Sequence, residues 1–340
     1  MAENLSEIGS DEIASYMCSE SCPDVLVANF VNKMVRVGVV QAGSFVYDTK
    51  KTLDKLEKLV AEAAQKGAQL VLFPEAFIGG YPKGLDFGVK LGSRSNEGRE
   101  EFKRYFDASI DYNGYESDMI GEVARKNNVY VVVGVVERDG CTLYCSVFFY
   151  GPDGNKLGKH RKLMPTALER VVWGFGDGST MPVLETNVGR FGAVICWENY
   201  MPLLRTSMYS KGIQLYLAPT VDDRESWLPI MRTIAMEGRC FVISACQFMH
   251  ASSYPSDHPA YLDPQHDKLL IRGGSCAVNP MGEVILEPDF TKEKIAIVEC
   301  DLSEIIAAKF DLDTVGHYAR PDIFQLTVNE KPQNPVTLDK

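Results

Sequence analysis

Three reactive side chains follow apolar segments of the chain: a thiol, a carboxylate and an ammonium. Cys196 comes directly after the apolar run FGAVI and is followed by Trp-Glu-Asn. Glu75 ends the segment QLVLFPE, and Lys162 lies in the basic segment KHRKLMP. Open α/β sheets place ligands at the carboxyl ends of their strands, so we expect the three side chains to meet at such an edge. Together they are the components of a thiol hydrolase that uses no catalytic histidine.

Each of these residues also has a purely structural interpretation. A cysteine after an apolar strand is often a core residue, a glutamate after proline is often solvated, and Lys162 belongs to a basic run. The helix expected to begin near Pro202 favours a reactive thiol, because a helix N-terminus stabilises a thiolate. Partial burial of Glu75 would raise its pKa toward neutrality, which suits a general base. Glu169 could hold Lys162 or position water, or it could form a salt bridge on a short helix.

The composition and charge of the 340-residue chain exclude several classes of protein. Hydrophobic residues make up 45% and charged residues 24%, as in ordinary globular proteins. A net charge of -11 argues against a nucleic-acid footprint, and no apolar run approaches the ~20 residues that cross a bilayer. The acidic amino-terminal segment has no apolar core of a secretion signal. We therefore expect a cytoplasmic protein with neither a nucleic-acid nor a membrane partner.

The nine cysteines are an odd number, scattered along the chain, and do not indicate a disulfide framework. A reducing compartment is the expectation that follows. The pairs Cys18/Cys22 and Cys141/Cys145 have the spacing of zinc ligands but lack matching partners, so isolated thiols are favoured over a metal site.

Strand and helix patterns alternate along most of the chain. The first strand, VRVGVVQ, precedes a helix over residues 48–67, in which apolar residues recur at helical spacing before Gly67. The alternation continues to KIAIVECDL and predicts one layered α/β domain over residues 34–312, with two sheets inside and helices outside. A flexible arm is expected over residues 1–33 and a tail over residues 313–340. The polar stretch 249–272 is expected to be a lid or an interface insertion.

Several long motifs occur together and in order. FPEAFIGGYPKGLDFG, HRKLMPTALERVVWGFGDGS and GAVICWENYMPLLR resemble the base, lysine and nucleophile segments of the nitrilase branch of the carbon–nitrogen hydrolase family. The resemblance covers residues 34–326. CWE is typical of nitrilases, whereas many amidases of the family have an aromatic residue and Asp after the cysteine. GDGST, CFVISACQF and VGHYARPD are similar to plant-type members.

This resemblance implies a fold and a set of roles. Glu75 would be the general base, Lys162 the cation at the tetrahedral centre, Cys196 the nucleophile and Glu169 a second acid. The implied fold is a four-layer α-β-β-α sandwich, and no metal or organic cofactor is implied. Family members form dimers that extend the sandwich and often larger spirals, so we expect a homo-oligomer with the tail 313–340 at a subunit interface.

The expected reaction converts a small-molecule nitrile and two waters to a carboxylic acid and ammonia, through a thioimidate and a thioester, with some amide release. Substrates are expected among arylaliphatic or small aliphatic nitriles such as β-cyanoalanine. The candidate pocket walls, for which core packing is the alternative, are Trp173, Trp197, Tyr200 and Trp227. Two departures from the family pattern bear on the substrate: Phe175 stands where many members have Gln, and Tyr200 where plant members often have Arg.

Two other functions remain open on the sequence. One is an amidase of the same superfamily, which would release ammonia from amides but not from nitriles. The other, from a different class, is a non-catalytic scaffold or filament subunit that keeps the fold. The presence of Glu75, Lys162 and Cys196 together argues against a scaffold, which needs none of them.

Overall fold

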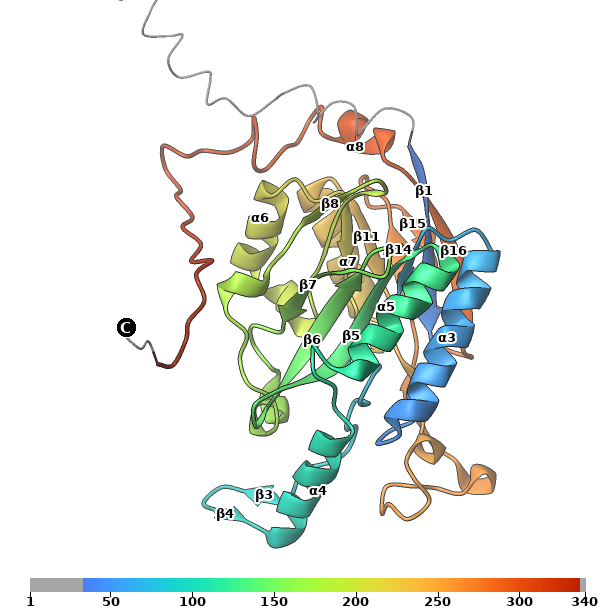
Figure 1. Ribbon diagram of the computed structural model, residues 1–340. Coiled ribbons are helices and arrows are strands. Elements are labelled where there is room, and N and C mark those ends of the chain that lie inside the picture. Colours follow the sequence, from blue (N-terminus) through green and yellow to red (C-terminus); the bar gives the residue numbers. More distant parts are fainter. Residues whose placement is uncertain (1–32, 337–340) are drawn as a thin grey trace, which may run out of the picture.

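The computed structural model describes residues 33–336, so all but the last residue of the expected amino-terminal arm, with Cys18 and Cys22, lies outside the described residues. Two six-stranded sheets form the centre of the molecule. Helices cover their outer faces (Figure 1). The predicted four-layer α-β-β-α sandwich is confirmed.

The first sheet has the order β16-β1-β2-β5-β6-β7. Its central strands β1, β2 and β5 are parallel, and the remaining pairs are antiparallel. The strands span Met34–Gln41 (β1), Leu70–Leu72 (β2), Tyr130–Asp139 (β5), Thr142–Tyr150 (β6), Lys156–Arg161 (β7) and Lys294–Asp301 (β16). Two helices, α3 (Thr49–Gln65) and α5 (Tyr115–Asn127), pack side by side on this sheet (Figure 1).

Helix α3 illustrates why these segments fold as they do. Its buried residues Leu53, Leu56 and Val60 recur at helical spacing and face the sheet. The Asp48 carboxylate accepts a hydrogen bond of 3.0 Å from the Lys51 N–H and caps the first turn. Gly67, with φ of 87°, ends the helix as the sequence predicts.

The second sheet has the order β15-β14-β11-β10-β9-β8, with β9, β10 and β11 parallel. Its strands span Leu184–Thr186 (β8), Gly189–Ala193 (β9), Leu215–Leu217 (β10), Phe241–Ser244 (β11), Cys276–Val278 (β14) and Val284–Leu286 (β15). Helices α6 (Pro202–Ser210) and α7 (Trp227–Gly238) form the outer layer on this side.

The apolar core divides between the layers according to strand periodicity. On β5, Val131 and Val133 pack in the cluster beneath α3 and α5, whereas Val132 belongs to the cluster between the two sheets. Phe191 and Leu215 of the second sheet fill the same central cluster. Because successive side chains of a strand point to opposite faces, one strand serves both layers.

Residues 249–272 form a strand-bounded segment beside helix α4 (Asn96–Asp107). The ends of this stretch pair as strands β12 (Phe248–His250) and β13 (Leu269–Arg272). Between them, the buried ring of His258 lies 3.1 Å from a Glu101 carboxylate oxygen on helix α4. The segment therefore packs against α4, and none of its residues lines the pocket beside Cys196. The expectation that residues 249–272 form a lid or an interface insertion stays a prediction.

A short hairpin of β3 (Val89–Lys90) and β4 (Ser93–Arg94) precedes α4, and the last helix is α8 (Ser303–Ala308). After α8 the described chain contains neither helix nor strand up to residue 336. No helix within residues 33–336 combines the length and the apolar character needed to cross a bilayer.

Candidate active site

The three reactive side chains meet between the two sheets. Glu75 comes three residues after β2, Cys196 three residues after β9, and Lys162 directly after β7. Lys162 Nζ lies 2.7 Å from Glu75 Oε1 and 2.8 Å from Glu169 Oε2. Glu75, Lys162 and Cys196 are all buried. The convergence expected from the strand ends is thus observed, and Glu169 joins it.

Several donors hold the Glu75 carboxylate. Besides Lys162, the Cys145 thiol lies 3.5 Å from Oε1, and the Val221 N–H donates to Oε2 at 3.1 Å. The Gln247 side chain fixes the Glu75 backbone carbonyl at 2.8 Å. Burial raises the pKa of Glu75, although the Lys162 ammonium opposes this shift. Such a carboxyl group can accept and return a proton more readily than an exposed one.

Cys196 lies on a strained turn between β9 and a 3₁₀ helix that spans Cys196–Tyr200. Its φ of 49° is unusual for a residue with a side chain. Ala76 and Ala167, which adjoin the other site segments, have φ of 48° and 49°. The Cys196 N–H donates to Pro219 O at 2.9 Å, and Thr220 Oγ1 lies 3.2 Å from the sulfur. Strain of this kind concentrates where a site must project a reactive group.

The environment of the thiol differs from the one that the sequence predicts. Helix α6 begins at Pro202, as expected, but the 3₁₀ helix Cys196–Tyr200 separates it from the thiol. Burial raises the pKa of the Cys196 thiol, and the Glu75 charge raises it further, whereas Lys162 lowers it. The expectation of a thiolate stabilised by a helix N-terminus is therefore wrong. A thiol whose pKa is raised in this way needs a base to become nucleophilic.

A buried Glu198 connects the nucleophile and lysine segments. One of its carboxylate oxygens accepts from the Ile195 N–H at 2.8 Å and lies 2.9 Å from His160 Nε2. The other accepts from the Leu163 N–H. His160 is also bound to Thr180 O at 2.6 Å through its second ring nitrogen. The two ring nitrogens of His160 contact Thr180 O and Glu198 rather than the Cys196 sulfur, so this imidazole positions Glu198.

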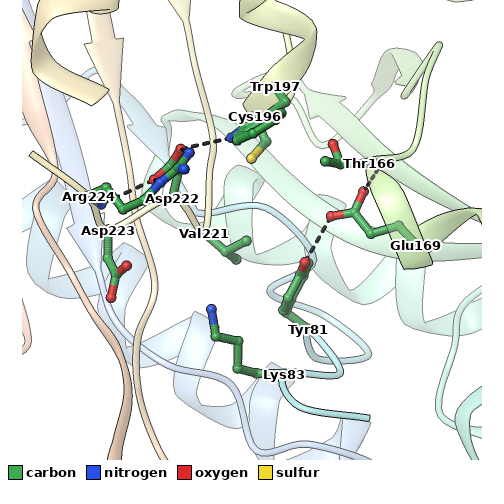
Figure 2. Close-up of a pocket in the computed structure, with 10 residues that line it drawn as sticks. All are labelled: Tyr81, Lys83, Thr166, Glu169, Cys196, Trp197, Val221, Asp222, Asp223 and Arg224. Atoms are coloured by element: carbon green, nitrogen blue, oxygen red, sulfur yellow. Dashed lines mark hydrogen bonds and ion pairs between the residues drawn. The ribbon is translucent and has the colours of Figure 1, made fainter. Parts of the chain in front are cut away.

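A pocket of about 200 Å³ opens onto the cysteine (Figure 2). Glu169 is held there by the Tyr81 hydroxyl at 2.8 Å and the Thr166 N–H at 2.6 Å. Charged residues surround the outer part of this pocket. The full lining consists of Tyr81, Lys83, Thr166, Glu169, Cys196, Trp197, Val221, Asp222, Asp223 and Arg224.

The four aromatic candidates lie in different places. Trp197 lines the pocket; its Nε1–H donates to Asp222 Oδ2 at 2.8 Å, and the Arg224 guanidinium lies 4.9 Å from its ring centre. Tyr200 packs edge-on against Trp197 at 5.6 Å but is not part of the pocket lining. Trp173 is buried, with its ring centre 5.7 Å from Lys162 Nζ.

Trp227 does not reach the pocket. It is buried in the cluster beneath α7 and donates from Nε1 to Ser244 Oγ at 2.9 Å. Trp227 is therefore a core residue, which was the alternative to a role as a pocket wall. Trp173 likewise lies behind Lys162 and outside the pocket lining.

Comparison with known proteins places this geometry in a family. The carbon–nitrogen hydrolase family model matches residues 36–310. The chain is 53% identical over 316 residues to a bifunctional nitrilase/nitrile hydratase of Lupinus angustifolius, covering 91% of this chain and 90% of the relative. Nitrilase 1 of Arabidopsis thaliana is 52% identical, with 89% of each chain covered. An aliphatic nitrilase of Sinorhizobium fredii is 50% identical, covering 88% of this chain and 97% of that one.

This chain belongs to the carbon–nitrogen hydrolase family. Solved structures agree on the fold. The Caenorhabditis elegans NitFhit protein superposes with a TM-score of 0.69 at 20% identity, covering 89% of this chain and 69% of that one. A carbon-nitrogen hydrolase of Helicobacter pylori gives a TM-score of 0.65 at 22% identity, with coverage of 85% and 96%. The predicted resemblance to plant-type nitrilases is confirmed.

Sequence reasoning missed several groups of this carbon–nitrogen hydrolase site. Tyr81, Cys145 and Thr220 each contact one of the charged or nucleophilic side chains. Thr220 has a signal in the sequence, because it follows β10 by the same three residues that separate Cys196 from β9. Among residues 33–336 no cluster of His, Cys, Asp and Glu is arranged to hold a metal ion.

Proposed function

We propose that this protein is a nitrilase that hydrolyses organic nitriles to carboxylic acids and ammonia, with Cys196 as nucleophile. One observation carries the proposal: the Cys196 thiol and the Glu169 carboxylate line one pocket, and the buried Lys162 ammonium and Glu75 carboxylate lie directly beside them. The names of relatives at 50% identity or more support nitriles as substrates.

The proposed chemistry assigns a task to each group. Glu75 takes the thiol proton as sulfur adds to the nitrile carbon, which gives a thioimidate. Lys162 stabilises the charge that builds on nitrogen, and one well-placed donor of this kind contributes about 3 kcal/mol. Water, oriented by Glu169, then adds to the thioimidate carbon. Loss of ammonia leaves a thioester, which a second water cleaves to the acid and the free thiol.

Amide release is a branch of the same pathway. The tetrahedral intermediate formed by the first water carries both nitrogen and sulfur. Departure of ammonia leads to the acid, whereas departure of the cysteine sulfur leads to the amide. The name of the Lupinus relative includes a nitrile hydratase activity, and it supports some amide release here.

The pocket supports small, polar nitriles over arylaliphatic ones. Its volume of about 200 Å³ is modest, and half of its ten lining residues are charged. Asp222 is bound by Arg224, and Asp223 accepts from the Arg272 N–H at 3.0 Å. The Lys83 ammonium, in contrast, has no hydrogen bond or ion pair with any residue in the range 33–336. A carboxylate on the substrate would meet this cation, so β-cyanoalanine is our first candidate.

A substrate panel tests the reaction. Purified protein is incubated with β-cyanoalanine, propionitrile and phenylacetonitrile and with the corresponding amides, and ammonia and amide are both measured. A nitrilase releases ammonia from nitriles, and Cys196→Ala abolishes this release while the unfolding temperature stays close to that of the wild type. Release from amides alone would instead establish the amidase alternative.

The scaffold alternative has a separate test. Alkylation of Cys196 by iodoacetamide, followed by peptide mass spectrometry, abolishes turnover in an enzyme and leaves assembly unchanged. Cys141 is the exposed cysteine among those described, so Cys141→Ser serves as the control that removes a bystander thiol. Absence of turnover on every nitrile and amide, with intact assembly, would favour the scaffold.

We also propose a cytoplasmic homo-oligomer larger than a dimer. Exposed apolar side chains in the carboxy-terminal tail support a subunit contact there, namely Tyr318, Ile323, Phe324 and Leu326. Seven free cysteines among the described residues are compatible with a reducing compartment. Light scattering that found only monomers would contradict the assembly.

A further inference from the structure

Thr220 occupies a position equivalent to that of the nucleophile on the adjacent parallel strand. It follows β10 by three residues, and its side chain is completely buried. Its hydroxyl oxygen lies 3.2 Å from the Cys196 sulfur and accepts a 2.9 Å hydrogen bond from the Asp222 N–H. These contacts connect the thiol directly to the segment that forms one wall of the pocket.

The Asp222 contact decides what the hydroxyl can do. A threonine hydroxyl has one hydrogen to donate and two lone pairs that accept. The backbone N–H occupies one lone pair, which orients the oxygen and leaves its hydrogen free for another acceptor. Among the described residues, the acceptor within reach of this hydrogen is the Cys196 sulfur. A thiolate accepts such a bond more strongly than a thiol, because hydrogen bonds to charged groups are the stronger ones.

The surrounding charges make this donor important. Glu75 and Glu169 oppose a negative sulfur, whereas Lys162 favours it. Lys162, however, is already bound to both carboxylates at 2.7 and 2.8 Å. Thr220 therefore supplies a neutral donor that no neighbouring carboxylate consumes.

We propose that Thr220 is a further catalytic residue, whose hydroxyl donates to the Cys196 sulfur whenever that sulfur carries negative charge. This occurs when Glu75 removes the thiol proton and again when the carbon–sulfur bond breaks. In the second event the bonding electrons return to sulfur, and the departing sulfur is then protonated by the acid form of Glu75. The role in turnover rests on the proposed nitrilase function, whereas the contact with sulfur does not.

A matched pair of substitutions isolates the hydroxyl. Thr220→Val keeps the shape and removes the donor, and Thr220→Ser keeps the donor with one methyl fewer. The rate of Cys196 alkylation by iodoacetamide is measured against pH by peptide mass spectrometry. We expect Thr220→Val to move the alkylation midpoint upward by about one pH unit, the size expected for one hydrogen bond to a charged group. Thr220→Ser should recover most of the wild-type profile.

Turnover supplies a second reading. Thr220→Val should lower kcat for nitrile hydrolysis about tenfold. It should also reduce the amide fraction of the product, because amide release requires sulfur to depart from the tetrahedral intermediate. Thr220→Ser should restore both quantities, which a packing defect common to the two variants would not allow.

Defined outcomes overturn the proposal. An unchanged alkylation profile in Thr220→Val, whatever its turnover, would reduce Thr220 to a packing residue, as would equal losses in the Val and Ser variants. If Thr220→Val does not fold, Thr220→Ala is compared with Thr220→Ser in the same assay, with the same expected order. Should the wild type lack nitrile turnover, the proposed function fails, while the alkylation comparison still decides whether Thr220 stabilises the sulfur.

Discussion

Lys162 Nζ and Glu75 Oε1 form a 2.7 Å ion pair that is completely shielded from solvent. Charges buried in this way are stable only when each keeps a partner. Lys162 has a second partner in Glu169 at 2.8 Å. In contrast, Glu75 and Glu169 have Lys162 as their shared ammonium. The two members of the pair are therefore not equivalent, and their removal should have unequal consequences for stability.

This asymmetry gives the first prediction. Lys162→Met leaves two carboxylates facing each other without a cation and should cost about 3–5 kcal/mol of unfolding free energy. Glu75→Gln preserves the Lys162–Glu169 pair and an acceptor for the Val221 N–H, so it should cost about 1–3 kcal/mol. Both variants should be inactive. Urea denaturation followed by circular dichroism measures the difference, and equal costs would show that the second carboxylate does not hold Lys162.

The pH dependence of turnover supplies a second prediction. Burial and the charge of Glu169 raise the pKa of Glu75, with Lys162 acting in the opposite direction. Because Glu75 must be ionised to accept the thiol proton, kcat/KM should rise with pH through an acid limb above about 4.3, the value for an exposed glutamate. Glu169→Gln removes a negative neighbour, so it should move this limb to lower pH. A limb that stays in place or moves upward in Glu169→Gln would exclude Glu75 as its origin.

The reactive residues that the sequence predicts to lie together are those at strand ends. Charged or nucleophilic residues directly after apolar strands are visible in one dimension. Glu75 and Lys162 follow strands of the first sheet and Cys196 follows a strand of the second, so the packing of the two sheets brings them together. Glu75 and Cys196 each follow their strand by three residues. Neutral groups inside strands, such as Cys145 in β6, carry no such signal. Their contacts depend on tertiary register, which the sequence does not specify locally.

The aromatic residues show where local sequence fails. Trp227, Met231 and Ile234 form one buried face of α7, and this helical spacing alone could have identified Trp227 as a core residue. Trp197 lies only one residue after the buried nucleophile and is 42% exposed. The direction of its side chain follows from the strained turn at Cys196, whose positive φ no sequence pattern here predicts.

Substrate charge provides a third prediction. If Lys83 binds a substrate carboxylate, Lys83→Met should lower kcat/KM for 3-cyanopropanoate about tenfold, the loss expected for one hydrogen-bonded charge contact. Turnover of its uncharged analogue 4-oxopentanenitrile should change little. Lys90→Met is the matched control, because it removes an equal charge on the neighbouring strand β3 outside the pocket lining. Equal effects of Lys83→Met on the two nitriles would remove Lys83 as a recognition group.

The carboxy-terminal tail carries the last prediction. Ile323 and Phe324 are 57% and 76% exposed, which is costly for large apolar side chains unless another surface covers them. Because no helix or strand follows α8 in the described chain, removal of residues 320–340 should leave both sheets intact. We expect this truncation to shift the particle mass in multi-angle light scattering to that of a smaller assembly.

The double substitution Ile323→Asp and Phe324→Asp should have the same effect at full length, because buried carboxylates without partners oppose an apolar contact. Lys331→Met and Glu330→Gln are controls that alter charge in the same tail while keeping its apolar side chains. An unchanged particle mass in the truncated protein would exclude the tail from the subunit contact.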